Sequence, residues 1–147
     1  MEKITVHDTL PSEAMRIRET VFVREQGFTD TAGEDDTLAH HLLLWDGEVP
    51  IATCRILKTE KPDEYLIGRI AVVAKRRGEG VGRRLLGYAE EHILSLGGKG
   101  AVIHAQCTAQ GFYERCGYMP AGEVEYEQGR AHIWMQKRFG VREEMAK

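Results

Sequence analysis

The chain has 147 residues, of which 42% are hydrophobic and 29% are charged, and its formal net charge is −3 at pH 7. This composition fits a globular protein, and we expect one domain over residues 1–147. No apolar run approaches the roughly 18 residues that a membrane span needs, and from the first residues of the sequence we expect no secretory leader. We therefore expect a cytoplasmic protein without a membrane partner, and the near-neutral charge argues against a nucleic-acid partner.

Hydrophobic periodicity divides the chain into strands and helices. In chain order it predicts a strand over Lys3–His7, a helix over Pro11–Phe22, an acidic loop over Gly27–Asp36, strands over His40–Trp45, Pro50–Leu57 and Tyr65–Val73, a helix over Val81–Leu96, a strand over Ala101–Ala105, a short helix over Ala109–Cys116, and strands over Glu123–Glu127 and His132–Lys137. Asp46-Gly47 is a hairpin signal. Hairpins in the first half and a strand-helix-strand crossover in the second predict a mixed α/β sheet.

A basic, glycine-rich turn joins the strand that ends near Val73 to the helix that begins near Val81. Its three glycines allow the backbone to bend, so that several amide N–H groups can point at one anion. The helix adds its own unpaired N–H groups and the positive end of its dipole. The flanking cations are Lys75, Arg76, Arg77, Arg83 and Arg84. This pattern predicts a phosphate-binding site.

Two common phosphate-binding motifs do not fit this turn. A P-loop has Lys-Ser/Thr directly after its last glycine, whereas Arg83-Arg84 follows Gly82 here. A Rossmann turn follows the first strand and has an acidic residue about 20 residues later, but this turn lies in mid-chain.

The pattern Arg77-x-x-Gly80-x-Gly82 resembles motif A of the GNAT superfamily of N-acetyltransferases, Arg/Gln-x-x-Gly-x-Gly/Ala. Other segments extend the resemblance over essentially the whole chain. Thr108–Tyr118 resembles the late helix of the superfamily, and Arg18–Gly27, Glu34-Asp35-Asp36 and Gly129–Met135 look like a small bacterial subgroup. The last of these segments is also distantly similar to the ending of glyphosate-type acetyltransferases.

The resemblance implies a fold and a co-substrate. The fold is a mixed, mostly antiparallel sheet of about six to seven strands flanked by helices, with a splayed parallel pair that forms the acetyl-CoA cleft. Acetyl-CoA is the implied co-substrate, and its pantetheine arm would pair with a strand edge. The residues expected to bind it are Ile70, Ala71, Val72, Arg77, Gly78, Glu79, Gly80, Val81, Gly82 and Arg83.

The resemblance also implies a reaction, in which the amine of a small molecule attacks the thioester directly. Tyr113 is the candidate general acid that protonates the departing sulfur, although helical position alone would make it a packing aromatic. His132 is the candidate general base, because imidazole titrates near neutral pH. Glu25, acting through water, is the alternative base. A backbone N–H of residues 70–72 is the expected oxyanion donor.

Glu25, His41 and Arg69 are the candidate acceptor-binding residues. An arginine at the place of Arg69 binds the anionic acceptor in glyphosate-type enzymes, and a surface ion pair is the alternative reading. We expect no metal, because the three cysteines lack Cys-x-x-Cys spacing and adjacent His40 and His41 point to opposite strand faces.

A non-catalytic acyl-CoA sensor or interaction module is the alternative function, and a protein or peptide amine is the alternative acceptor. A homodimer is compatible with the sequence.

Overall fold

The computed structural model describes residues 1–28 and 33–140, so the predicted acidic loop lies partly outside the described residues. The chain divides into two compact units. The first contains Met1–Leu57 and Ile67–Glu91, and the second contains Lys58–Leu66 and His92–Lys147. Strand β4 (Glu64–Val72) contributes residues to both units.

The first unit contains an antiparallel sheet. Its strands are β1 (Glu2–His7), β2 (His40–Asp46), most of β3 (Val49–Lys58) and the second part of β4. In the register of this sheet Ile4 lies opposite Leu44, and Leu42 lies opposite Cys54. Gly47 adopts the left-handed φ of +61° in the β2–β3 hairpin, which is where the sequence predicts a turn.

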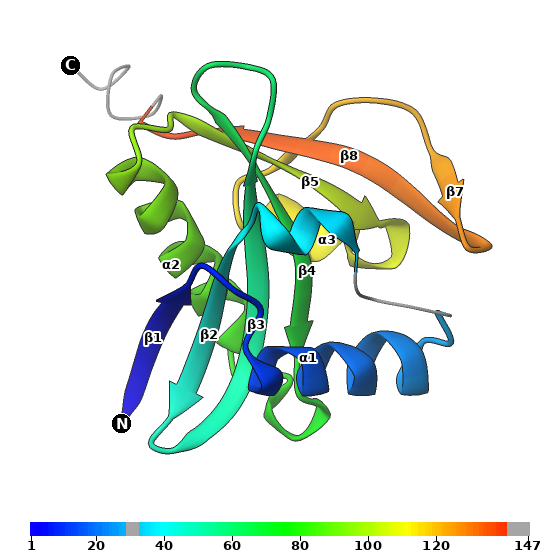
Figure 1. The fold of residues 1–147 in the computed structure, drawn as a ribbon. Coiled ribbons are helices and arrows are strands. Elements are labelled where there is room, and N and C mark those ends of the chain that lie inside the picture. Colours follow the sequence, from blue (N-terminus) through cyan, green and yellow to red (C-terminus); the bar gives the residue numbers. More distant parts are fainter. Residues whose placement is uncertain (29–32, 141–147) are drawn as a thin grey trace. The chain divides into compact units, whose positions relative to one another are not determined.

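The first helix is longer than its sequence pattern predicts. Helix α1 (Ser12–Arg18) continues as the π-helical segment η1 (Glu19–Glu25), and the Gln26 N–H donates to the Val21 carbonyl over 3.1 Å. Figure 1 shows this helix running across the strands of its unit. It buries Ala14, Ile17 and Val21 against Leu43 and Ala71. The apolar spacing therefore identifies the buried face, but it does not reveal the final turn that carries Glu25.

Helix α2 (Val81–Ser95) begins at the predicted residue and buries Leu85, Leu86, Ala89 and Ile93. Leu96, the last residue of the predicted helix, lies past the end of α2 and is 38% exposed. Gly97, at a φ of +87°, ends the segment.

The second unit contains two long strands and several short elements. Its elements are the start of β4, β5 (Gly100–Gln106), the 3-10 turn η4 (Cys107–Ala109), α3 (Gln110–Arg115), β6 (Met119–Pro120), β7 (Glu125–Glu127) and β8 (Arg130–Arg138). Strands β5 and β8 are antiparallel, with Ile103 opposite Met135 and His104 opposite Trp134. Because side chains alternate along a strand, Ile103 and Met135 lie on one face and His104 and Trp134 on the other.

Hydrogen-bonded strands follow the order β1-β2-β3-β4-β5-β8-β6, with β7 also paired to β8. Only the start of β4, Glu64–Leu66, is in parallel register with β5, at Gly100–Val102. This mixed, mostly antiparallel arrangement with one parallel pair confirms the predicted fold class. Eight strands are present in the described residues, one more than the seven segments that the sequence predicts. The additional strand is β6, whose two residues are too few to give a periodic signal, whereas β7 lies within the predicted strand over Glu123–Glu127.

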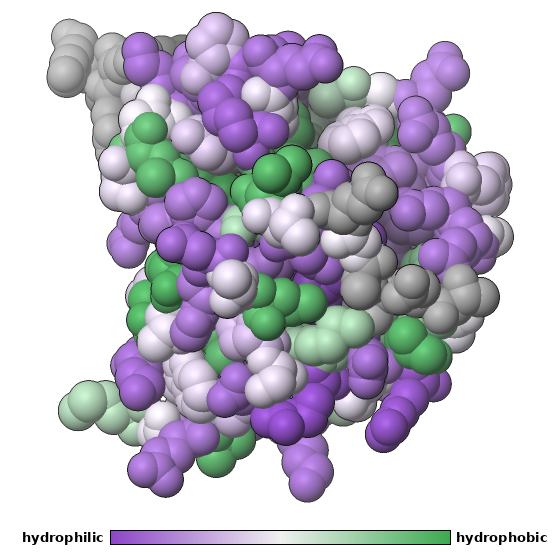
Figure 2. All heavy atoms as spheres, in the orientation of Figure 1, coloured by the Kyte–Doolittle hydropathy of each residue, from purple (hydrophilic) through white to green (hydrophobic). Residues whose placement is uncertain are grey.

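Hydrophilic side chains predominate on the face drawn in Figure 2, and the hydrophobic side chains there form separate patches. A search of the described helices finds none with the length and hydropathy of a bilayer-spanning helix.

Candidate active site

The glycine-rich turn has the backbone geometry of an anion cradle. After β4 the chain makes one 3-10 turn, η3 (Ala74–Arg76), which the sequence did not predict. Gly78 and Gly80 then adopt φ values of +83° and +78°, a region that side chains with a Cβ rarely adopt. A Cβ on Gly80 would also lie 3.2 Å from an Arg84 guanidinium nitrogen. The positive φ therefore favours glycine at position 80, and a side chain there would also displace the Arg84 guanidinium.

Helix α2 begins directly after this turn, so its first amide groups lie at the turn. The Arg84 N–H donates to the Gly80 carbonyl over 3.1 Å, which is the first α-helical bond at this end. The N–H groups of Val81, Gly82 and Arg83 precede that bond, so the helix itself supplies no acceptor for them. The first turn carries no acidic residue. These amides and the helix dipole favour a bound anion.

Three of the arginines around the turn are held by carboxylates. Arg76 contacts Glu79 and Asp46, each at 2.8 Å, and its hydrogen bond lowers the pKa of Asp46. Arg84 contacts Glu2 at 3.1 Å and the Glu79 carbonyl at 2.9 Å.

The third is Arg77, which donates from Nε to the Val72 carbonyl over 3.0 Å and contacts Glu25 through Nη2 at 2.7 Å. Across residues 1–28 and 33–140, Lys75 and Arg83 form no ion pair, so they are the cations most available to a ligand.

Strand β4 is distorted immediately before the predicted cofactor-binding segment. Arg69 has a φ of +51°, which is unusual for a residue with a side chain. The parallel register with β5 extends only to Leu66 and Val102. A local break in a strand redirects the backbone groups that follow it. Ile70 is the first of these residues. Strand patterning did not reveal the break, because arginine gives no signal for a positive φ.

A buried charge network in the first unit was not predicted by the sequence. The Asp36 carboxylate accepts two hydrogen bonds from Arg18, both at 3.0 Å, and one from Arg55 at 2.9 Å. Burial by itself would raise the pKa of Asp36, but the bonds from Arg18 and Arg55 outweigh it and lower the pKa to about 2. The carboxylate also accepts from the Gly33 N–H at 3.1 Å. Asp36 therefore anchors the 3-10 turn η2 (Glu34–Thr37) to the helix and to β3.

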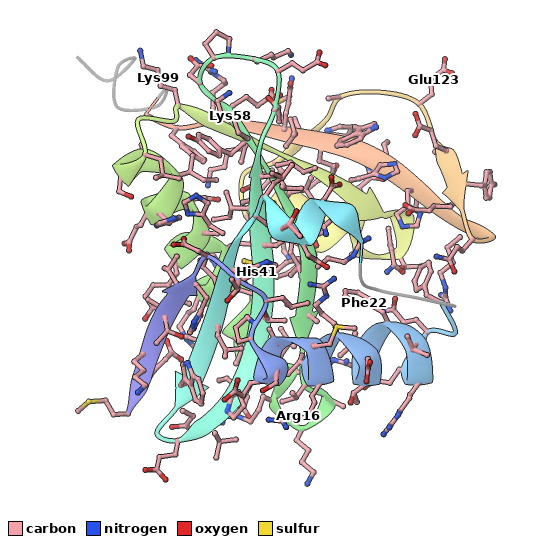
Figure 3. All side chains as sticks on the ribbon, viewed as in Figure 1. Arg16, Phe22, His41, Lys58, Lys99 and Glu123 are labelled. Atoms are coloured by element: carbon pink, nitrogen blue, oxygen red, sulfur yellow. The ribbon has the colours of Figure 1, made fainter. Side chains whose placement is uncertain are left out.

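His41, a predicted acceptor-binding residue, belongs to this network. Figure 3 labels it on β2. Its side chain is almost fully buried, and Nε2 donates to the Asp36 carbonyl over 2.9 Å. Burial lowers the pKa of His41.

Tyr113 lies on α3 in the second unit, where it is 8% exposed. Its ring packs edge-on against Phe112 at 5.1 Å and Tyr118 at 6.2 Å between centroids. The helix ends at Arg115, and Gly117, which has a φ of +96°, follows it. The Tyr118 N–H then donates to the Tyr113 carbonyl over 3.0 Å. The aromatic packing fixes the side chain, as required for a positioned acid and equally for a core residue.

His132 lies on β8, on the face opposite Ile133, as strand alternation predicts. Nδ1 is 2.8 Å from the Arg130 carbonyl, and a carbonyl can only accept, so Nδ1 carries the proton of the neutral ring. This tautomer puts the basic lone pair on Nε2. The ring is 5% exposed and lies 5.0 Å from that of His104, which in turn stacks on Trp134 at 4.4 Å. The sequence did not predict this row of rings.

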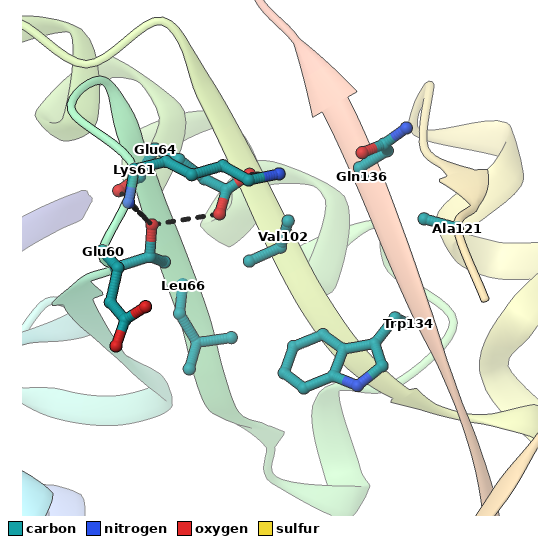
Figure 4. Close-up of a pocket in the computed structure, with 9 residues that line it drawn as sticks. Glu60, Lys61, Glu64, Leu66, Val102, Ala121, Trp134 and Gln136 are labelled. Carbon is teal, nitrogen blue, oxygen red and sulfur yellow. Dashed lines mark hydrogen bonds and ion pairs between the residues drawn. The ribbon is translucent and has the colours of Figure 1, made fainter. Parts of the chain in front are cut away.

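A cavity of about 590 Å³ is present in the second unit. Figure 4 shows Leu66, Val102 and Trp134 among its lining residues, together with the hydrogen-bonded β3–β4 turn. Its lining residues are Thr59, Glu60, Lys61, Glu64, Leu66, Val102, Ala121, Trp134 and Gln136. None of the sequence-predicted site residues lines this cavity, but Trp134 connects it to the row of rings that ends at His132.

The predicted site residues thus divide between the two units. The glycine-rich turn, residues 70–72, Glu25, His41 and Arg69 belong to the first unit, and Tyr113 and His132 belong to the second. Within the described ranges, no group of three or more His, Cys, Asp or Glu side chains is placed to hold a metal ion.

Comparisons with known proteins agree with the fold. A family model described as an acetyltransferase (GNAT) domain matches residues 14–139. The chain is 35% identical over 128 residues to the protein ElaA of Escherichia coli, covering 84% of each chain. The crystal structure of Escherichia coli ElaA superimposes with a TM-score of 0.83, covering 94% of this chain and 100% of that one at 30% identity.

Two further solved structures have the same fold. An acyl-CoA N-acyltransferase from Pseudomonas aeruginosa gives a TM-score of 0.81 at 26% identity, covering 93% of this chain and 99% of that one. A Bacillus subtilis acetyltransferase, solved in complex with CoA, gives a TM-score of 0.72 at 18% identity, covering 95% and 99%. With the family match over most of its length, this chain belongs to the GNAT family of N-acetyltransferases.

Proposed function

We propose that this protein transfers the acetyl group of acetyl-CoA to the amine of a small molecule. The observation that carries the proposal is the turn at residues 77–82, in which two left-handed glycines precede a helix whose first amides have no helical acceptor. Such a turn fits a pyrophosphate. The CoA bound to the Bacillus subtilis neighbour supports the same ligand.

In this proposal the first unit binds the co-substrate. Arg77 to Arg83 hold the pyrophosphate, and the edge of β4 at Ile70, Ala71 and Val72 pairs with the pantetheine arm. The break at Arg69 turns a backbone N–H of this segment toward the thioester carbonyl, where it stabilises the oxygen as it becomes negative. Arg69 and Glu25 contribute to acceptor binding.

The second unit supplies the proton transfers. Nε2 of His132 takes a proton from the acceptor ammonium, because its Nδ1 is already committed to the Arg130 carbonyl. The neutral amine attacks the thioester carbonyl, and the C–S bond breaks as the tetrahedral intermediate collapses. Tyr113 donates its phenolic proton to the departing sulfur. If His132 is not the base, Glu25 acts through water.

Two measurements on the same protein test the proposal. Acetyl-CoA at 100 times its dissociation constant should stabilise the fold by about 2.7 kcal/mol in thermal unfolding. A panel of small amines with thiol detection should then identify an acceptor that releases CoA. Stabilisation without any turnover on amines or peptides would instead support an acyl-CoA sensor. Turnover on peptides alone would move the acceptor class to protein amines.

A further inference from the structure

We propose that Glu25 competes with the pyrophosphate of acetyl-CoA for the Arg77 guanidinium, so that acetyl-CoA binding releases this carboxylate for the acceptor amine. This rests on the proposed function, because it requires pyrophosphate at the glycine-rich turn. It goes further by making one ion pair the link between co-substrate and acceptor.

The contact is short but accessible. Nη2 of Arg77 lies 2.7 Å from Oε1 of Glu25, the distance of a charge-assisted hydrogen bond. The two side chains are 45% and 31% exposed, so solvent screens the pair and a ligand can reach it. Exposed ion pairs of this kind add little to stability. A dianionic pyrophosphate can therefore displace the carboxylate with only a small cost in free energy for breaking the ion pair.

The backbone around Glu25 does not favour a negative charge. Glu25 is the last residue of η1, and the left-handed Gly27 follows it. The carbonyl end of a helix carries partial negative charge and repels a carboxylate. In contrast, the amides of Val81 to Arg83 at the start of α2 attract anions. Arg77 therefore contacts an anion whose helix environment is unfavourable, and it lies four residues before a helix end whose free amides favour another anion.

Arg77 can change partners without leaving the turn. Its Nε donates to the Val72 carbonyl over 3.0 Å, which ties the guanidinium to the end of β4. Only the terminal nitrogen that contacts Glu25 needs a new acceptor. The neighbouring Arg76 is less exchangeable, since it is held by both Asp46 and Glu79.

The consequence is an order of binding. Before acetyl-CoA binds, the Glu25 charge is neutralised by Arg77. Once pyrophosphate takes Arg77, the carboxylate is free to attract the cationic acceptor or to accept its proton through water. Glu25 thus opposes co-substrate binding slightly and favours acceptor binding afterwards.

Calorimetric titration with CoA tests the competition. Glu25→Gln should bind CoA about two- to five-fold more tightly than the wild type, the range expected when one exposed ion pair no longer has to be broken. The same variant should unfold at a slightly lower temperature without ligand, because it lacks the pair. The matched control is Asp63→Asn, which removes a carboxylate from an exposed arginine pair, at 3.3 Å from Arg138, outside the turn. It should leave the CoA affinity unchanged.

A double-substitution cycle assigns the effect to Arg77. In an Arg77→Lys background, which keeps the charge but loses the two-point contact, Glu25→Gln should change CoA affinity by less than it does in the wild type. Unchanged or weaker CoA binding by Glu25→Gln would overturn the inference and make Glu25 a residue that orients Arg77. Failure of the wild type itself to bind CoA would instead overturn the proposed function.

Discussion

Arg18 and Asp36 meet through two parallel hydrogen bonds of 3.0 Å, and the guanidinium is only 1% exposed. Arg55 adds a third bond to the same carboxylate at 2.9 Å, so one buried anion is shared by two cations. Removal of one partner from such a cluster leaves an uncompensated buried charge. This network connects the helix, β3 and η2, and its contribution to stability can be measured.

Asp36→Asn should lower the free energy of unfolding by about 3 kcal/mol, because both arginines then lose their counter-charge. Urea denaturation at pH 7 measures the loss. Asp35→Asn is the matched control, since Asp35 is 63% exposed and lies 3.8 Å from Arg55. Asp35→Asn should lower the free energy of unfolding by less than about 1 kcal/mol. Equal losses of unfolding free energy for the two variants would show that burial does not increase the contribution of Asp36 to stability.

The Asp36 pair should also make stability depend on acid pH. Its pKa falls from 3.8 to about 2 on folding, so the unfolded chain binds this proton at higher pH than the folded one. The resulting stabilisation, about 2 kcal/mol, is complete above about pH 5 and is lost as the pH falls from there through about 2. The stability difference between wild type and Asp36→Asn should shrink over that interval. A constant difference would contradict the lowered pKa.

Gly80→Val should abolish the thermal stabilisation by acetyl-CoA. The substitution forces a β-branched side chain into a φ of +78° and places its Cβ 3.2 Å from Arg84. Gly87→Ala is the control on α2, because a Cβ there meets nothing within 4 Å. It should raise the unfolding temperature, since alanine favours a helix by about 0.5–1 kcal/mol over glycine, and keep the ligand shift. If acetyl-CoA still raised the unfolding temperature of Gly80→Val, the turn would not be part of the binding site.

Tyr113→Phe should lower turnover by about 10²–10⁴-fold while CoA affinity stays near the wild-type value, because only the proton donor is removed. Thioester donors with better leaving groups should reduce the defect. Tyr118→Phe removes a hydroxyl from the neighbouring buried ring, 6.2 Å away, and should keep the wild-type dependence on leaving group. If the two variants behave alike, Tyr113 is a packing residue.

His132→Ala should depress the rate most at neutral pH, where the acceptor is an ammonium, and least at high pH, where solvent has already deprotonated it. The acidic limb of the pH–rate profile should then move toward the pKa of the amine. His7→Asn, which removes an imidazole from β1 in the first unit, should leave that limb in place. A His132→Ala profile identical to that of the wild type would make Glu25 through water the leading base.

Local sequence determined the parts of this protein that depend on neighbouring residues. The glycines at 78 and 80 and the apolar spacing after Val81 predicted both the turn and the first residue of α2, because backbone permissiveness and helical periodicity act over a few residues.

Tertiary structure decided the features that need a distant partner. Asp36 is an ordinary loop aspartate in the sequence, and only Arg18 and Arg55 from other elements make it a buried anchor. Glu25 was predicted as the alternative base, but its contact with Arg77 joins two residues that are far apart in the sequence, so no local pattern reveals it. The positive φ of Arg69 has no local signal in the sequence, because arginine rarely adopts this conformation in a strand. The sequence specifies the chemistry of each side chain, whereas the tertiary packing of strands and helices decides which charged groups contact one another.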